Sequence, residues 1–172
     1  MKTFLSRLLR SILHLWVRPH QAVQLVDPLD YDKMVHLDAE ELAEGGLAAA
    51  YEKLLPEILQ FAADPIAAIE EFEESDGSFR ARAGEQVYTI WSENGERGEG
   101  WTRASIALFD VVNRSLENSN VRFYAFYGGN DLSGMFLTED QVAKARVALP
   151  KRSDWPYLMV DEPPNCGFPV EA

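Results

Sequence analysis

The sequence predicts an α+β fold in which helices pack on one face of a small, mostly antiparallel sheet. Its 172 residues suffice for a single domain with a core, and 47% of them are hydrophobic while 26% are charged. Helical and strand-like hydrophobic spacings occur in a mixed order along the chain. The expected organisation is a basic helix over residues 1–19, an acidic α+β domain over 20–162 and a loose tail over 163–172.

The N-terminal segment is predicted to be an amphipathic helix with four basic residues and no acidic one. We do not expect a signal peptide, because Arg7 and Arg10 interrupt the apolar stretch and no small-residue cleavage site follows. The apolar run is also too short to span a bilayer. We therefore expect a cytoplasmic protein whose N-terminal apolar face packs on protein, with membrane contact through residues 1–18 as the second choice.

Two helices are predicted in the first half of the acidic domain. Asp38 has the position of an N-cap, and Glu41 completes a capping box for a helix that continues to about Leu55. Asp64-Pro65 is typical of a helix start, with a cap followed by proline at the first helical position. It predicts a short helix from Ile66 to Glu74.

The second half is predicted to hold a hairpin, two helices and further strands. The hairpin joins Phe79–Ala83, where apolar residues alternate with arginines, to Gln86–Ser92, which is rich in β-forming residues, across Gly84-Glu85. The remaining expected elements are a helix at Trp101–Leu116, strands at Val121–Tyr127 and Met135–Leu137, a helix opened by the Thr138 capping box, and an edge strand or extended clasp at Trp155–Val160.

The charge of the chain favours one class of partner. Its formal net charge is −12, which opposes direct nucleic-acid binding because phosphates would be repelled. The same charge speeds encounter with a basic protein. We expect no cofactor and no metal, since the sequence carries no zinc or calcium signature. Cys166 is the single cysteine, and nothing beside it in sequence would activate it as a nucleophile.

The acidic residues are concentrated between Asp38 and Asp76, a stretch that contains twelve acidic residues and one basic residue. Within this tract the predicted short helix carries four glutamates, and like charges spaced i,i+4 destabilise a helix. No opposite charge nearby in the sequence offsets this repulsion, which favours selection of the glutamates for binding a partner. The candidate partner-binding residues are therefore Glu70, Glu71, Glu73, Glu74 and Asp131.

The glycine-rich loop from Gly128 to Gly134 is the segment that most suggests a ligand site. Its candidate residues are Gly128, Gly129, Asn130, Asp131 and Ser133. The loop lacks the Lys-Ser/Thr pair of a P-loop, and Asp131 would repel a phosphate. We favour a plain strand connection, in which glycines take positive φ and Asn130 and Asp131 form side-chain turns.

Three segments resemble the immunity proteins that are encoded beside bacterial polymorphic and contact-dependent toxins. They are the acidic tract Asp38–Asp76, the aromatic and glycine-rich stretch Phe123–Thr138, and Asp154–Leu158. Many such proteins are small, acidic α+β domains that bind a basic toxin domain and block it. The resemblance implies a non-enzymatic, neutralising binding protein whose partner is a basic toxin domain, for example a nuclease.

Two other functions stay open at this stage. The chain could bind a small ligand or act as an enzyme through the Gly128–Gly134 loop, together with Trp91, Trp101 or Tyr127. It could also be a peripheral membrane adaptor that uses its N-terminal helix.

Overall fold

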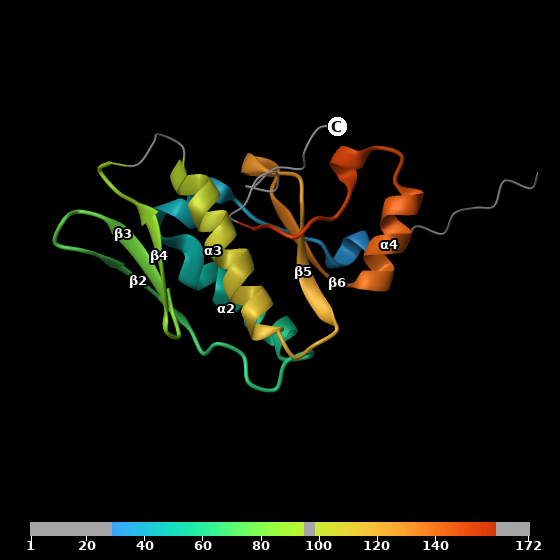
Figure 1. Cartoon of the computed structure of the whole chain (residues 1–172), viewed down its shortest axis with the longest axis horizontal. Helices are drawn as coiled ribbons and strands as arrows, with labels where there is room; N and C mark the ends of the chain where they lie inside the picture. Colours follow the sequence, from blue (N-terminus) through green and yellow to red (C-terminus); the bar gives the residue numbers. More distant parts are fainter. Residues whose placement is uncertain (1–28, 95–98, 161–172) are drawn as a thin grey trace, which may run out of the picture.

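A computed structural model describes residues 29–94 and 99–160 (Figure 1). The predicted helix at 1–19, the predicted tail at 163–172 and Cys166 lie outside these residues.

The α+β class is confirmed, and the single expected sheet is instead two three-stranded antiparallel sheets, β2-β3-β4 and β1-β6-β5. The strands are β1 (Val35–His36), β2 (Ile69–Glu73), β3 (Phe79–Ala83), β4 (Gln86–Trp91), β5 (Val121–Phe126) and β6 (Ser133–Thr138). The helices are α1 (Ala39–Glu41), α2 (Leu47–Ile58), α3 (Glu99–Ser115) and α4 (Glu139–Ala148), with the short turns η1 (Tyr31–Lys33), η2 (Leu42–Gly46), η3 (Gly129–Asp131) and η4 (Arg152–Asp154).

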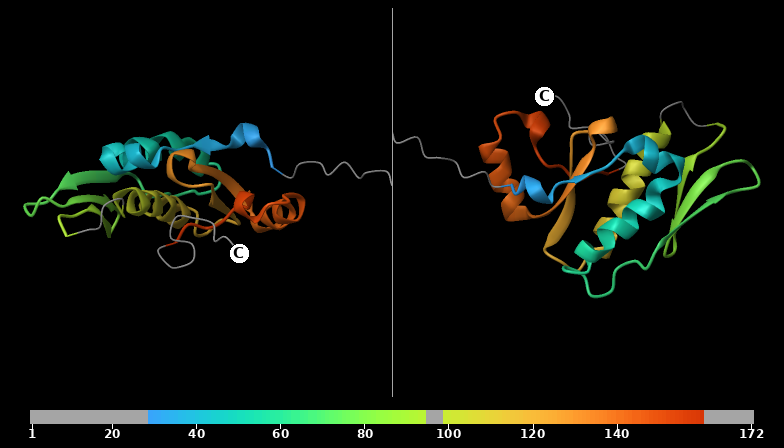
Figure 2. Two further views of the ribbon diagram at one scale, coloured as in Figure 1. Left: turned by 90° about the horizontal axis from the view of Figure 1, so that it is seen from above. Right: turned by 180° about the vertical axis from the view of Figure 1, so that it is seen from behind.

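The elements form four successive layers (Figures 1 and 2). Helices α2 and α3 lie between the two sheets, and α4 covers the far face of the β1-β6-β5 sheet. The main core fills the space around α2 and α3, where the rings of Phe109 and Phe123 stack with centroids 4.7 Å apart. A second cluster lies under α4 and consists of Leu29, Tyr124, Phe126, Met135, Leu137, Val142 and Ala145.

Several local predictions are confirmed. Asp38 accepts hydrogen bonds from the backbone N–H of Glu40 and Glu41, as an N-cap does. Thr138 and Gln141 form the predicted capping box of α4. The hairpin closes with Ala83 opposite Gln86, because Gly84 takes φ +61 in the two-residue turn.

The predicted helix from Ile66 to Glu74 is wrong, because this segment is extended and forms strand β2. Long-range hydrogen bonds fix the backbone just before β2. The Ile66 carbonyl accepts from the Tyr51 hydroxyl at 2.6 Å, and the Ile66 N–H donates to Ser115 Oγ at 3.2 Å. Ile69 then lies opposite Ala83 in the sheet. The helix prediction relied on the local start signal Asp64-Pro65, whereas the observed strand buries Ile69 and partly covers Phe72.

Trp155–Val160 forms an extended clasp on the second sheet. Ala125 and Tyr157 exchange two backbone hydrogen bonds of 2.8 and 3.0 Å. The hydroxyl of Tyr157 donates to the Tyr127 carbonyl at 2.6 Å. The clasp therefore occupies part of the open edge of β5.

Candidate partner-binding site

The four glutamates predicted to contact a partner lie on strand β2 and directly after it. Glu70 pairs with Arg82 on the neighbouring strand, with 2.9 Å between Oε2 and Nη1. Glu74 lies 3.7 Å from the guanidinium of Arg80. The inference that these charges are crowded on a helix without counter-charge is therefore wrong, because strand pairing brings two arginines to them.

Glu71 has a structural role. Its two carboxylate oxygens accept hydrogen bonds from the backbone N–H of Leu47 and Ala48, at 3.2 and 3.1 Å. These residues begin α2, where unpaired N–H groups and the helix dipole favour a negative charge. Glu71 therefore joins β2 to the start of α2. Of the four glutamates, Glu73 alone is exposed with no ion pair among the described residues.

A different set of exposed acidic residues lies at the start of the described domain. Glu40 and Glu41 belong to α1, Glu44 belongs to η2, and α1 packs against η3, which carries Asp131. All four side chains are exposed, and none of them forms an ion pair with any residue that the structure describes. We call these four residues the acidic ridge. The fold thus brings the predicted Asp131 close to the opening of the acidic tract rather than to its end.

The Gly128–Gly134 loop is closed by hydrogen bonds among its own residues. The turn η3 is closed by Asp131 N–H to Gly128 O and Leu132 N–H to Gly129 O. The Ser133 hydroxyl is buried, donates to the Asp131 carbonyl and contacts His36 Nδ1 at 3.1 Å. Asn130 and Asp131 are exposed. These contacts favour the strand connection over a ligand loop.

A groove that sequence patterns did not predict lies between β4, α3 and the end of the clasp. It has a volume of about 860 Å³. Its walls are Gln86, Val87, Tyr88 and Thr89 of β4, Thr102, Arg103, Ile106 and Asp110 of α3, and Met159 and Val160. The sequence signal that could have revealed it is the hairpin strand itself, since an edge strand beside a helix leaves such a channel.

Tyr88 lines this groove. Its hydroxyl donates to Asp110 Oδ2 at 2.5 Å and accepts from Arg114 Nη1 at 3.2 Å. Burial, and next the hydrogen bond to Asp110, raise the pKa of Tyr88 to about 12. Tyr88 is therefore a neutral donor at physiological pH, which ties β4 to α3.

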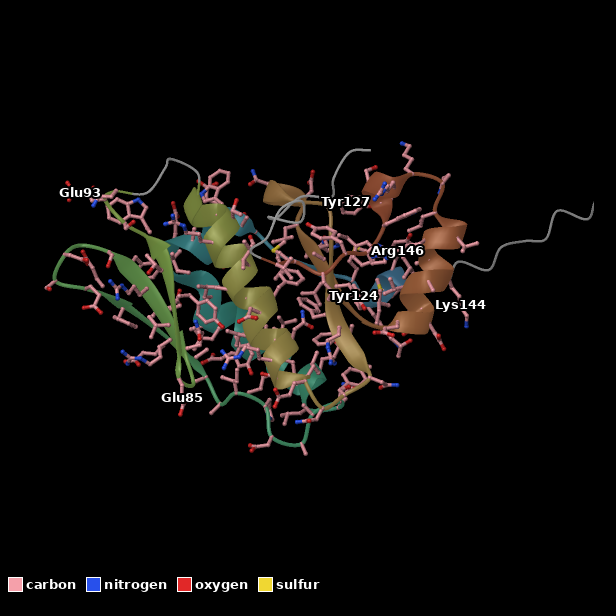
Figure 3. All side chains as sticks on the ribbon, in the orientation of Figure 1. Glu85, Glu93, Tyr124, Tyr127, Lys144 and Arg146 are labelled. Atoms are coloured by element: carbon pink, nitrogen blue, oxygen red, sulfur yellow. The ribbon has the colours of Figure 1, made fainter. Side chains whose placement is uncertain are left out.

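Acidic residues lie at both ends of β4. Glu85 is at the hairpin turn and Glu93 follows the strand at the opposite end (Figure 3). Trp91, at the Glu93 end, is 52% exposed, and Trp101 of α3 is 40% exposed. The acidic ridge lies near the same end, because η2 packs on α3 and Ala43 approaches Gly100.

Comparisons of the chain with protein-family models, with curated proteins and with solved structures find no match. The geometry of the described residues therefore carries the interpretation. Within residues 29–94 and 99–160, none of the helices has both the length and the apolar character that crossing a membrane requires. Over the same ranges, no three His, Cys, Asp or Glu side chains gather as a potential metal-ligand set.

The groove is chemically suited to binding. Its described lining residues carry hydroxyl, amide and apolar side chains, with one basic and one acidic residue. Neither histidine nor cysteine is among them. Every buried side-chain nitrogen and oxygen in the described part of the chain has a hydrogen-bond partner. Such a site offers apolar contact together with hydrogen-bond donors and acceptors.

Proposed function

We propose that the protein is a non-enzymatic binding protein that holds a basic protein partner and neutralises it, in the manner of immunity proteins. The observation that carries the proposal is the acidic ridge of Glu40, Glu41, Glu44 and Asp131, which has no counter-charge among the described residues. The net charge of −12 acts in the same direction. A basic toxin domain, such as a nuclease, is the class of partner that this surface fits.

Two physical effects support this function. Unpaired surface carboxylates create a negative potential that steers a basic partner and accelerates association, an effect that salt suppresses. The exposed indoles of Trp91 and Trp101 lie near the ridge and supply apolar anchors, the residue type most enriched at binding hot spots. Charge then sets the encounter rate, and aromatic burial holds the complex.

The proposal is tested with the product of the neighbouring reading frame. The two proteins are co-expressed in a growth assay, and association of the purified pair is measured over a series of salt concentrations. We expect the full chain to restore growth and the association rate to fall steeply with salt. A partner that is not toxic, or an association rate indifferent to salt, would contradict the proposal.

The ridge itself is tested by isosteric neutralisation. The variant Glu40→Gln, Glu44→Gln, Asp131→Asn should slow association about tenfold at low salt. The matched control Glu52→Gln, Asp64→Asn, Glu139→Gln removes the same charge from other exposed positions. The control should keep most of the association rate, and equal losses in both variants would show that net charge matters but the ridge does not.

A further inference from the structure

The two sheets have four edges. In the β1-β6-β5 sheet, the described residues make both edges unfavourable for pairing with a further strand. Strand β1 has only two residues, and a very short edge strand is a poor template for pairing. On the other side, Phe123 is hydrogen-bonded in both directions by the Asn113 side chain, and Ala125 by the Tyr157 backbone. The outer edge of β5 is therefore already occupied.

The two edge strands of the β2-β3-β4 sheet, β2 and β4, differ in charge. Strand β2 carries three glutamates in five residues, and charged side chains on an edge strand oppose pairing with another chain. Strand β4 has six residues and none of them is charged. Five of the six, from Val87 to Trp91, are β-branched or aromatic. No described strand pairs with the outer edge of β4.

The register shows which backbone groups of β4 point outward. Ala83 and Gln86 flank the two-residue turn and are the first hydrogen-bonded pair, so Ala81 and Tyr88 are the next one. The intervening residues of β4, Val87 and Thr89, therefore direct their N–H and C=O groups away from β3. Both are exposed and both line the groove.

From this geometry we infer that the outer edge of β4 receives an extended segment of the partner as an added strand. The inference rests on the proposed function and names the docking mode. The added strand makes backbone hydrogen bonds with Val87 and Thr89, and its alternate side chains enter the groove against Ile106 and Met159. The indole of Trp91 supplies an apolar contact at one end.

Charge defines the ends of the segment. Glu85 and Glu93 stand beyond the two ends of β4, and neither forms an ion pair with a described residue (Figure 3). A strand rises about 3.3 Å per residue, so the distance between them corresponds to about eight residues. The fitting segment is a β-forming stretch with a basic residue near each end, which agrees with a basic partner.

The test uses the full chain and a synthetic peptide of about nine residues, the length set by strand rise, in which alternating valine and threonine lie between terminal lysines. Amide hydrogen exchange is followed residue by residue. We expect the Val87 and Thr89 amides to exchange quickly in the free chain and to be protected by the peptide. The Gln86 and Tyr88 amides, which face β3, should be protected in both states.

Two variations probe the mode of contact. The substitution Val87→Pro removes an outward N–H, a change that an edge strand tolerates, whereas the control Val87→Thr keeps it. We expect the proline variant to bind the peptide about tenfold more weakly than the threonine variant. If the proline variant does not fold, the same loss is expected from a peptide N-methylated on alternate residues along its pairing edge. A peptide with terminal glutamates should also bind about tenfold more weakly at low salt.

Several results would overturn strand addition. They are slow exchange of Val87 and Thr89 in the free chain, binding without protection of these amides, equal affinities of the proline and threonine variants, and self-association that the proline substitution abolishes. Failure of the proposed function has a separate readout, because neutralising the acidic ridge would then leave association of the purified partner unchanged. The docking mode and the charge preference can thus fail independently.

Discussion

The side-chain amide of Asn113 makes two hydrogen bonds to the backbone of Phe123: Nδ2 donates to the Phe123 carbonyl at 3.0 Å, and the Phe123 N–H donates to Oδ1 at 2.8 Å. A helix side chain thereby takes the place of a neighbouring strand. The amide both closes the edge of β5 and fixes the distance between α3 and the second sheet.

Replacing Asn113 with alanine should destabilise the domain by about 1–3 kcal/mol, because two backbone groups of Phe123 lose their partner in a partly buried place. The free energy of unfolding is measured by denaturant titration. Asn118→Ala is the control, since Asn118 is exposed and its side chain donates to the neighbouring Glu117 side chain. Equal stability of the Asn113 and Asn118 variants would contradict the bracing role.

Glu71 should matter for stability rather than for binding. The substitution Glu71→Ala removes the cap of α2 and should lower the free energy of unfolding by about 1 kcal/mol. Glu73→Ala, on the same strand but exposed, should stay within about 0.5 kcal/mol of the parent. Thermal and denaturant unfolding compare the pair. A larger loss in the Glu73 variant would show that the helix cap is not what Glu71 contributes.

Gly134 should tolerate no side chain, because the ring of Phe123 lies where a Cβ would be. Gly134→Ala should cost about 1–3 kcal/mol through forced displacement of the ring. Gly100→Ala provides a control of opposite sign: a Cβ there meets only ordinary contacts in the first turn of α3, and alanine favours a helix. If Gly134→Ala left the free energy of unfolding unchanged, the core would have to repack readily around Phe123.

The pH dependence of stability should contain a contribution from Tyr88 at alkaline pH. Burial, followed by the hydrogen bond to Asp110, raises the pKa of this phenol from the ordinary value of about 10 to about 12. A raised pKa means that the stability is fully present below about pH 10 and is lost as the pH rises through about 12. Unfolding titrations of the parent and of Tyr88→Phe should diverge in slope over this window. Parallel curves would contradict the assignment.

Elements with local signals were predictable from the sequence. The N-cap at Asp38, the capping box at Thr138 and Gln141, and the hairpin across Gly84-Glu85 depend on contacts within a few residues. The long helix α3 has an apolar stripe wide enough to be recognised from spacing alone. Each of these interactions joins residues that are close in the sequence, so it can be predicted without knowledge of the rest of the fold.

The acidic tract shows what local patterns could not decide. Asp64-Pro65 favours a helix by local rules, yet Tyr51 and Ser115 hold Ile66 in an extended path, and pairing with β3 makes a strand. The same pairing brings Arg80 and Arg82 to glutamates that seemed uncompensated.

The sequence by itself determined that this is an acidic α+β domain with capped helices and one clear hairpin, since composition, caps and tight turns depend on near neighbours. Tertiary structure alone decided that the described residues form two sheets, which carboxylates are neutralised, and that no described strand pairs with the outer edge of β4, which lies beside a groove. These features depend on residues that are distant in the chain, and hydrophobic spacing carries no information about which distant strands and side chains will meet.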